Sequence, residues 1–211
     1  MNPEKQRSEL SDQSLNLEGQ TRIFGVWILL ISPENQIFML KNLKLKHITH
    51  KVPGQIGVPA ETCKSQDNRK FYETLRRGIV EEVGPIDYGE SKPKMIGVVN
   101  FKSNGYDIVA PAFLIPVTNK GSIHFDPNEE TPSDPENCCP EWVNLEDITY
   151  AKKLPVGPFE VPLYRFPMVE IAEMIKKYQR THLLQIRRLK TPIPNEVFEY
   201  LEQNASTATS A

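Results

Sequence analysis

The chain has 211 residues, of which 39% are hydrophobic, and its 25 Lys and Arg residues nearly balance its 27 Asp and Glu residues. This length predicts one domain of ordinary size with room for additional segments. A formal net charge of −2 argues against a protein that coats nucleic acid, since such proteins carry a basic excess. The first twenty residues are polar and the longest apolar run, Ile23–Ile31, is far shorter than the roughly 20 residues that span a bilayer. We therefore expect neither a secretory signal peptide nor a membrane span.

The prolines and cysteines indicate the kind of loops and the cellular compartment to expect. Proline occupies 18 of 211 positions, against about 5% in average proteins. Because apolar runs interrupt the prolines, they predict stiffened loops on a compact domain. The three cysteines, Cys63, Cys138 and Cys139, have no CxxC metal spacing. They predict reduced thiols in a cytoplasmic protein.

The first predicted elements form a β-hairpin. Arg22–Ser32 and Gln36–Lys41 are rich in β-branched and aromatic residues, and turn-forming residues separate them. The basic stretch Lys41–Lys51 predicts a solvated loop, with capture of a substrate phosphate as the functional alternative. Val52–Val58 contains Pro and Gly and predicts a loop or short strand with close backbone approach.

The clearest helix is predicted over Phe71–Val83. Its apolar residues recur every four positions and form one stripe, made of Phe71, Leu75, Ile79 and Val83. Gly84 and Pro85 are helix-ending residues and place its C-terminus.

The remaining elements mix strands and short helices. We expect strands at Met95–Phe101, Tyr106–Val117 and Glu141–Val143, a loop at Asp126–Pro140, and helices at Leu145–Tyr150, Pro167–Tyr178 and Pro194–Glu202. This order predicts the α/β class. Lys176–Lys190 holds six Lys or Arg residues and no acid, which predicts the solvated face of a terminal helix rather than an RNA contact.

The domain boundaries follow from composition. We expect disordered segments at 1–20 and 204–211 around a single domain at 21–203. Within that domain, a C-terminal helical extension is expected to begin at about residue 160. The sequence carries no signal for the oligomeric state.

A glycine loop and an acidic helix carry the strongest chemical signal. Gly54 lets bare backbone approach a ligand. The helix offers two adjacent carboxylates, Glu81 and Glu82, and Arg77 lies one turn earlier, where it can orient a carboxylate. Carboxylates and a backbone carbonyl are hard oxygen ligands that suit Mg²⁺ or Mn²⁺. Such a site is suited to phosphate chemistry.

These residues resemble the Nudix box, G-x5-E-x7-R-E-U-x-E-E-x-G-U, in which U is an apolar residue. The matching positions are Glu61, Arg77, Ile79, Glu81, Glu82 and Gly84. Gly54 is similar to the glycine that commonly precedes the box. Glu141–Ile148 resembles the strand-then-helix segment that follows in the family, with its W-x-x-L-x-x-[LI] pattern. The resemblance covers roughly Thr21–Tyr150.

The resemblance implies a Nudix-like α/β/α sandwich with a mixed β-sheet. It also implies a metal-dependent pyrophosphohydrolase that cleaves a nucleoside diphosphate linked to another moiety by attack of water on phosphorus. The Gly54 carbonyl, Glu81 and Glu82 would hold Mg²⁺ or Mn²⁺, and Arg77 would orient Glu61 or Glu81. A further metal ligand or general base would come from the loop before Trp142. Its candidates are Glu136 and, as alternatives, Glu129 and Glu130.

Four departures from the box define the alternative functions. Gln55 stands where the box has its first Gly, Pro85 stands at its last apolar position, and fifteen residues instead of seven separate Glu61 from Arg77. Gly78 replaces the first Glu of R-E-U-x-E-E, which in the family binds metal or positions water. Because Gly costs about 1 kcal/mol relative to Ala in a helix, Gly78 either admits a ligand or marks a loss of activity. The alternatives are a catalytically impaired Nudix-fold nucleotide-binding module and an unrelated α/β domain.

Overall fold

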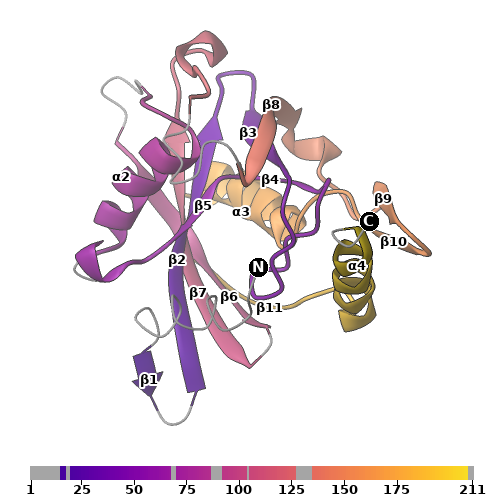
Figure 1. The fold of residues 1–211 in the computed structure, drawn as a ribbon. Coiled ribbons are helices and arrows are strands. Elements are labelled where there is room, and N and C mark those ends of the chain that lie inside the picture. Colours follow the sequence, from indigo (N-terminus) through magenta and orange to yellow (C-terminus); the bar gives the residue numbers. More distant parts are fainter. Residues whose placement is uncertain are drawn as a thin grey trace.

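The computed structural model describes residues 15–17, 20–67, 70–86, 92–103, 105–126 and 135–208 (Figure 1). The predicted terminal segments, 1–20 and 204–211, lie outside the described residues except for a short strand and the last turns of a helix. Glu129 and Glu130 also lie outside the described residues.

A mixed nine-stranded sheet forms the centre of the molecule. Its strands are β1 (Leu15–Leu17), β2 (Gln20–Ile31), β3 (Gln36–Asn42), β4 (Ile56–Gly57), β5 (Ala60–Thr62), β6 (Lys94–Ser103), β7 (Tyr106–Pro116), β8 (Asn137–Asn144) and β11 (Gln185–Lys190). The main order is β11-β6-β7-β2-β3-β4, with β1 and β5 added to β2 and β8 added to β3. Strands β2 and β7 pair in parallel, as do β11 and β6, and the other pairs are antiparallel.

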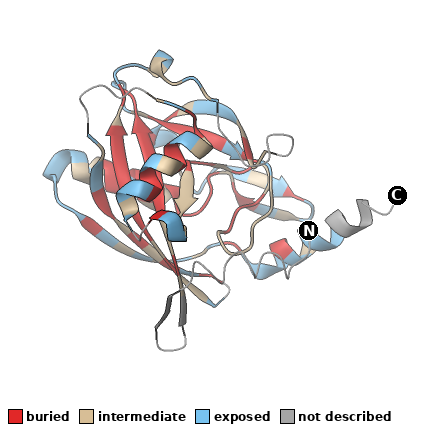
Figure 2. Cartoon of the chain, turned by 60° about the vertical axis from the view of Figure 1, so that its left-hand side comes forward, coloured by how far each residue is buried: buried red, intermediate tan, exposed pale blue. Residues whose placement is uncertain are grey.

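One long helix covers each face of the sheet (Figure 1). Helix α2 (Phe71–Glu82) packs over Ile28, Leu30 and Phe113, and helix α3 (Met168–Thr181) packs over the opposite face. Figure 2 shows that buried residues concentrate in the central strands. The α/β/α sandwich with a mixed sheet that the sequence predicted is therefore confirmed.

Local chemistry explains where α2 ends. Leu75, Ile79 and Val83 are buried against the sheet, which fixes the inner face of the helix. Gly84 then adopts a φ of +105°, and its N–H donates to the carbonyl of Ile79 at 3.0 Å. A Cβ at Gly84 would lie 2.4 Å from the Asp126 carbonyl oxygen, so both the conformation and the space require glycine.

The C-terminal part of the chain builds a smaller unit beside the sheet. Strands β9 (Lys153–Val156) and β10 (Phe159–Pro162) form a separate hairpin, and helix α4 (Asn195–Ala208) lies next to it (Figure 1). Val52, from the loop before β4, is buried with Val161 and Phe198 in the small core of this unit. The C-terminal segment therefore contacts the glycine loop that the sequence singled out. No helix in the described part of the chain is long and apolar enough to cross a membrane.

The basic stretch Lys176–Lys190 was predicted to be the solvated face of a helix, but only its first part is helical. Helix α3 ends at Thr181, where His182 takes a left-handed φ of 55°, and Gln185–Lys190 forms the edge strand β11. The helical prediction was wrong for this second half because the pairing with β6, far away in sequence, decides its structure. The short helices Ser65–Asp67, Lys120–Ser122 and Leu145–Asp147 are 3-10 turns.

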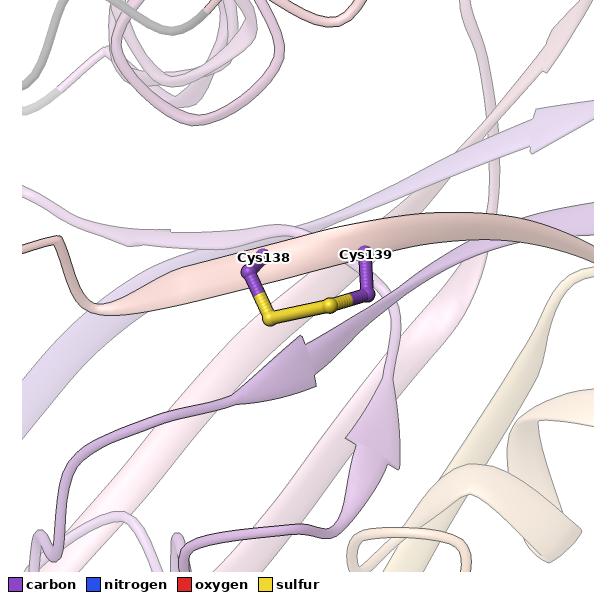
Figure 3. Close-up of a disulfide and its surroundings, with 2 residues drawn as sticks. All are labelled: Cys138 and Cys139. Carbon is purple, nitrogen blue, oxygen red and sulfur yellow. A yellow bond between two sulfur atoms is a disulfide. The ribbon is translucent and has the colours of Figure 1, made fainter.

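The expected reduced state of all three cysteines was also wrong. Cys138 and Cys139 form a disulfide between adjacent residues in β8, whereas Cys63 is free (Figure 3). Cys139 has a φ of 55°, a backbone conformation that no sequence signal indicated.

Candidate active site

Arg77 lies at the centre of a network of carboxylates in the candidate site. Its Nη1 lies 2.9 Å from Oε1 of Glu61 and 2.8 Å from Oε2 of Glu81. Its Nη2 donates to the Thr62 carbonyl at 2.7 Å and to Oδ2 of Asp67 at 2.8 Å. Hydrogen bonds to Asp67 and Glu61 outweigh burial and raise the pKa of Arg77 above its usual range. The guanidinium thus fixes the two glutamates for which the sequence proposed it.

Asp67 is a site residue that the sequence analysis missed. It lies in the insertion between Glu61 and Arg77, and its side chain is 4% exposed. Its carboxylate accepts hydrogen bonds from Arg77, from the Lys64 N–H at 2.8 Å and from the Thr74 hydroxyl at 2.9 Å. Although burial works in the opposite direction, these bonds lower the pKa of Asp67 to about 2. The insertion therefore supplies a third carboxylate that holds Arg77, beside Glu61 and Glu81.

The stability of the chain should decrease as the pH falls from about 4 to about 2. The pKa of Asp67 is about 2 in the folded chain, against 3.8 for an ordinary aspartate. The stabilisation is therefore complete above the unfolded pKa and is lost as the pH falls through the folded pKa, a change of about 2 kcal/mol. Urea unfolding of the wild type and of Asp67→Asn between about pH 5 and about pH 2 measures it. Asp67→Asn should lose about 2 kcal/mol less over this window, and an equal loss in both proteins would contradict the assignment.

Gly78, the main departure from the Nudix box, makes room for Glu61. A Cβ on Gly78 would lie 2.6 Å from Cβ of Glu61 and 3.1 Å from Cδ1 of Ile28. Glu61 comes from β5, which pairs with β2 beneath the helix. The space in which a side chain at position 78 would begin is thus already filled by aliphatic atoms of Glu61 and Ile28. Close packing of this kind explains a glycine in the interior of α2.

Adding a side chain at Gly78 should destabilise the protein and should not restore a missing function. Gly78→Ala gains about 1 kcal/mol of helix propensity, but overpacking of this kind costs about 1–3 kcal/mol, and Gly78→Glu should cost more. Val80→Ala on the exposed face of α2 is the matched control, with a change within about 0.5 kcal/mol. Urea unfolding measures all three variants. A Gly78→Ala variant that is more stable than the wild type would contradict the packing argument.

Glu82 lies at the end of α2 in a more acidic setting than Glu81. It is half-buried, and Nδ2 of the buried Asn137 donates to its Oε2 at 2.7 Å. Burial, followed by repulsion from Glu61 and Glu136, raises the pKa of Glu82 to about 7, although Lys51 partly offsets the change. Glu61 and Glu136 therefore both lie within electrostatic reach of Glu82. A perturbed carboxylate in such a cluster is a candidate for a functional group.

A group of cations faces these glutamates from the basic loop. Lys46 forms an ion pair with Oε1 of Glu136, and Nζ of Lys51 lies 3.6 Å from Oε2 of the same carboxylate. Lys51 is buried, with 8% of its side chain exposed, and burial lowers its pKa to about 8. The predicted solvated loop Lys41–Lys51 therefore sends one lysine into the site. Sequence spacing did not single out Lys51 from its neighbours.

Arg165 reaches the same place from the C-terminal segment. It is 2% exposed, its Nη2 donates to the Val58 carbonyl at 3.1 Å, and its guanidinium carbon lies 5.1 Å from the ring centroid of Trp27. Burial lowers the pKa of Arg165 to about 10, although Glu82 and Glu136 oppose the change. No pattern in the sequence connects Arg165 to a box more than eighty residues earlier.

Gln55, which stands where the Nudix box has its first Gly, anchors the loop that contains Gly54. Gln55 is fully buried, accepts from the Val52 N–H at 3.1 Å, and donates from Nε2 to the Pro162 carbonyl at 2.8 Å. Gly54 has a φ of +89°, and its N–H donates to the Asn42 carbonyl at 2.8 Å. Gln55 therefore fastens the loop to the C-terminal segment. No described contact joins Gly54 to the acidic residues.

The donor chemistry of the site fits a hard divalent cation held by few protein ligands. Within the described residues, no group of three or more His, Cys, Asp or Glu side chains is placed to hold a metal ion. Glu81 is bound by Arg77 and Lys64, and Glu136 by Lys46 and Lys51, whereas Glu82 is destabilised by neighbouring negative charge. Mg²⁺ commonly takes one or two carboxylates and completes its shell with water and substrate phosphate. Glu82 is the carboxylate in this site that is best placed to bind such an ion.

Comparisons with known proteins place the fold. No protein-family model and no curated protein matches the sequence. The MutT protein from Methanosarcina mazei Go1 is 18% identical, with a TM-score of 0.50 over 79% of this chain and 99% of that one. The NUDIX domain of Shewanella oneidensis NrtR, solved with ADP ribose, is 10% identical, with a TM-score of 0.54 over 85% of this chain and 99% of that one. The E. coli ORF135 protein is 13% identical, with a TM-score of 0.52 over 78% of this chain and 96% of that one.

At these identities, structural likeness is informative about the fold. It agrees with the mixed sheet and with α2 and α3 on opposite faces. The chain therefore has the Nudix fold that its Glu61–Gly84 segment predicted.

Proposed function

We propose that the protein is a Nudix-type hydrolase of phosphoric anhydride bonds. Its substrate would be a nucleoside diphosphate linked to another moiety, cleaved by attack of water on phosphorus. The observation that carries the proposal is Glu82 at the end of α2, held by Asn137, whose charge is disfavoured by burial and by Glu61 and Glu136, is only partly offset by Lys51, and would be stabilised by a divalent cation. The ADP ribose bound to the NrtR domain is a compound of this class and supports the choice of substrate.

In this proposal, Glu82 anchors Mg²⁺ or Mn²⁺, and the candidates for a second protein ligand are Glu81, Glu136 and the Gly54 carbonyl. The ion, when bound, supplies neutralisation of phosphate charge and a more acidic water. Asn137 orients Glu82 through its 2.7 Å hydrogen bond.

The other catalytic residues act around this anchor. Arg77 holds Glu61 and Glu81 in place through its 2.9 Å and 2.8 Å contacts. Either Glu61 or Glu136 accepts the proton of the attacking water, since both carboxylates lie within electrostatic reach of Glu82.

A panel of nucleoside diphosphate derivatives tests the proposal. The purified protein is incubated with nucleoside diphosphate sugars, ADP-ribose and dinucleoside polyphosphates, in Mg²⁺, in Mn²⁺ or in EDTA. We expect at least one compound to release a nucleoside monophosphate in the presence of metal and none in EDTA. Absence of turnover across the panel, or equal turnover in EDTA, would contradict the proposal.

A second candidate, a Nudix-fold nucleotide-binding module without catalysis, is favoured by a different observation. Two proposed ligands already have cationic partners: Glu136 is paired with Lys46 and Lys51, and Glu81 with Arg77 and Lys64. Such a module would show a higher melting temperature with a nucleotide and no metal-dependent hydrolysis. Melting curves on the same panel of compounds separate the two functions.

A further inference from the structure

Two buried cations beside the acidic cluster have no role in the function proposed above. Lys51 is 6% exposed and Arg165 is 2% exposed. A buried charge is costly unless an anion and hydrogen bonds compensate it. Within the described residues, Nε of Arg165 is buried and has no hydrogen-bond partner. The Nε–H of Arg165 is therefore a buried donor without a protein acceptor among the described residues.

The fold holds Arg165 in this position through several contacts. The N–H of Arg165 donates to the Ile56 carbonyl at 2.7 Å, and the N–H of Ile56 donates to the Leu163 carbonyl at 2.9 Å. A Cβ on Gly57 would lie 3.0 Å from Nε and 3.2 Å from Cβ of Arg165, so the absence of a side chain at Gly57 makes room for the arginine. The C-terminal segment thus places the buried Arg165 cation beside the acidic residues of the site.

Two carboxylates compensate the charge of Lys51: Glu82, which acts on it electrostatically, and Glu136, which forms an ion pair with it and is partly exposed. The ion pair of Lys51 within the described residues is to Glu136, at 3.6 Å between Nζ and Oε2. One third of the Glu136 side chain is exposed, and its other oxygen pairs with the half-buried Lys46. The carboxylate therefore approaches the buried ammonium from the open side of the site. An anion entering from that side would meet Lys51 in the place that Glu136 occupies.

We propose that Lys51 and Arg165 bind a phosphate group of the substrate, and that Glu136 takes the place of this phosphate on Lys51 in the ligand-free chain. The assignment rests on the proposed function for its substrate class. Arg165 contributes its unused Nε–H donor, and Lys51 contributes the ammonium that Glu136 releases. A diphosphate linkage carries phosphate oxygens for both the buried cations and the acidic cluster. Glu136 therefore competes with the substrate for Lys51.

Binding of inorganic pyrophosphate in EDTA tests this competition without metal or turnover. Isothermal titration of the full chain gives the dissociation constants of the wild type, Lys51→Met, Arg165→Met and Glu136→Gln. We expect Lys51→Met and Arg165→Met to weaken binding by about tenfold or more, as expected for loss of a charged hydrogen bond. Glu136→Gln removes the competitor and should tighten binding severalfold. The two directions together distinguish competition from general damage to the site.

The control is Lys176→Met, which removes a lysine that pairs with Glu146 and Glu173 on the surface and should leave binding unchanged. Melting curves identify any variant that fails to fold, and the half-exposed Glu136 keeps the test usable if Arg165→Met does not fold. Wild-type affinity in Lys51→Met, or unchanged or weaker binding in Glu136→Gln, would overturn the inference. Because no hydrolysis is measured, the expected binding pattern without turnover in the substrate panel would contradict only the proposed hydrolase.

Discussion

Glu82→Gln should abolish metal-dependent hydrolysis while leaving the protein folded. Loss of a residue that merely supports a metal ligand costs about 10–100-fold in activity, so loss of the anchoring carboxylate should reduce kcat by more than about 100-fold. The neutral amide keeps the shape of the side chain and removes a charge that burial and the repulsion from Glu61 and Glu136 disfavour more than Lys51 favours it, so stability should stay equal or rise. Steady-state kinetics on a substrate found in the panel, with urea unfolding of the same samples, measure both effects.

Glu73→Gln is the matched control for this loss. Glu73 lies on the same helix, is 49% exposed and pairs with Arg76 at 3.7 Å on the outer surface. Its kcat should equal that of the wild type. Wild-type turnover in Glu82→Gln would remove Glu82 from the mechanism, and an equal loss in both variants would indicate an unspecific effect on α2.

Arg77→Met should give the largest loss of stability among the substitutions considered. It leaves Asp67, 4% exposed, and Glu61, 11% exposed, without their shared cation. Removing one partner of a buried ion pair costs about 3–5 kcal/mol because the remaining charge is uncompensated. Urea unfolding at neutral pH should show this decrease in the free energy of unfolding.

The neighbouring arginine provides the control for this prediction. Arg76 is 77% exposed, and its ion pair with Glu73 spans 3.7 Å. Arg76→Met should therefore change stability by no more than about 0.5 kcal/mol. Similar losses in the two variants would show that the Arg77 network does not hold the site together.

The parts of the fold that depend on local pattern were predictable from the sequence. The four-residue spacing of Leu75, Ile79 and Val83 gave α2 to within one residue, because burial against the sheet selects that spacing. Strands β2 and β7 were likewise placed to within two residues at each end. By contrast, β11 was missed because its structure depends on pairing with β6, about ninety residues earlier.

In the candidate site, too, contacts set by a local motif were predictable, whereas residues placed by tertiary packing were not. Arg77 was expected to orient Glu61 or Glu81 and contacts both, since a box motif encodes contacts within one helix and its loop. Asp67 and Arg165 could not be found in this way. Asp67 lies in an insertion without a recognisable pattern, and Arg165 arrives through tertiary packing of the C-terminal segment on Ile56 and Gly57.

Gly78 and Gln55, two of the residues that depart from the Nudix box, have structural explanations that the sequence alone did not provide. Gly78 faces a glutamate side chain from β5, and Gln55 joins the loop to Pro162 through a buried hydrogen bond. Both are explained by contacts with distant segments. Neither needs a loss of function as its cause.

Binding of Mn²⁺ to the full chain tests most directly the central claim that Glu82 anchors a divalent cation. Electron paramagnetic resonance of free Mn²⁺ can be followed in a titration of the wild type and of Glu82→Gln, with Glu73→Gln as the control. The account predicts saturable binding to the wild type and to Glu73→Gln and its loss in Glu82→Gln. Saturable binding that survives in Glu82→Gln, or no binding to the wild type, would contradict it.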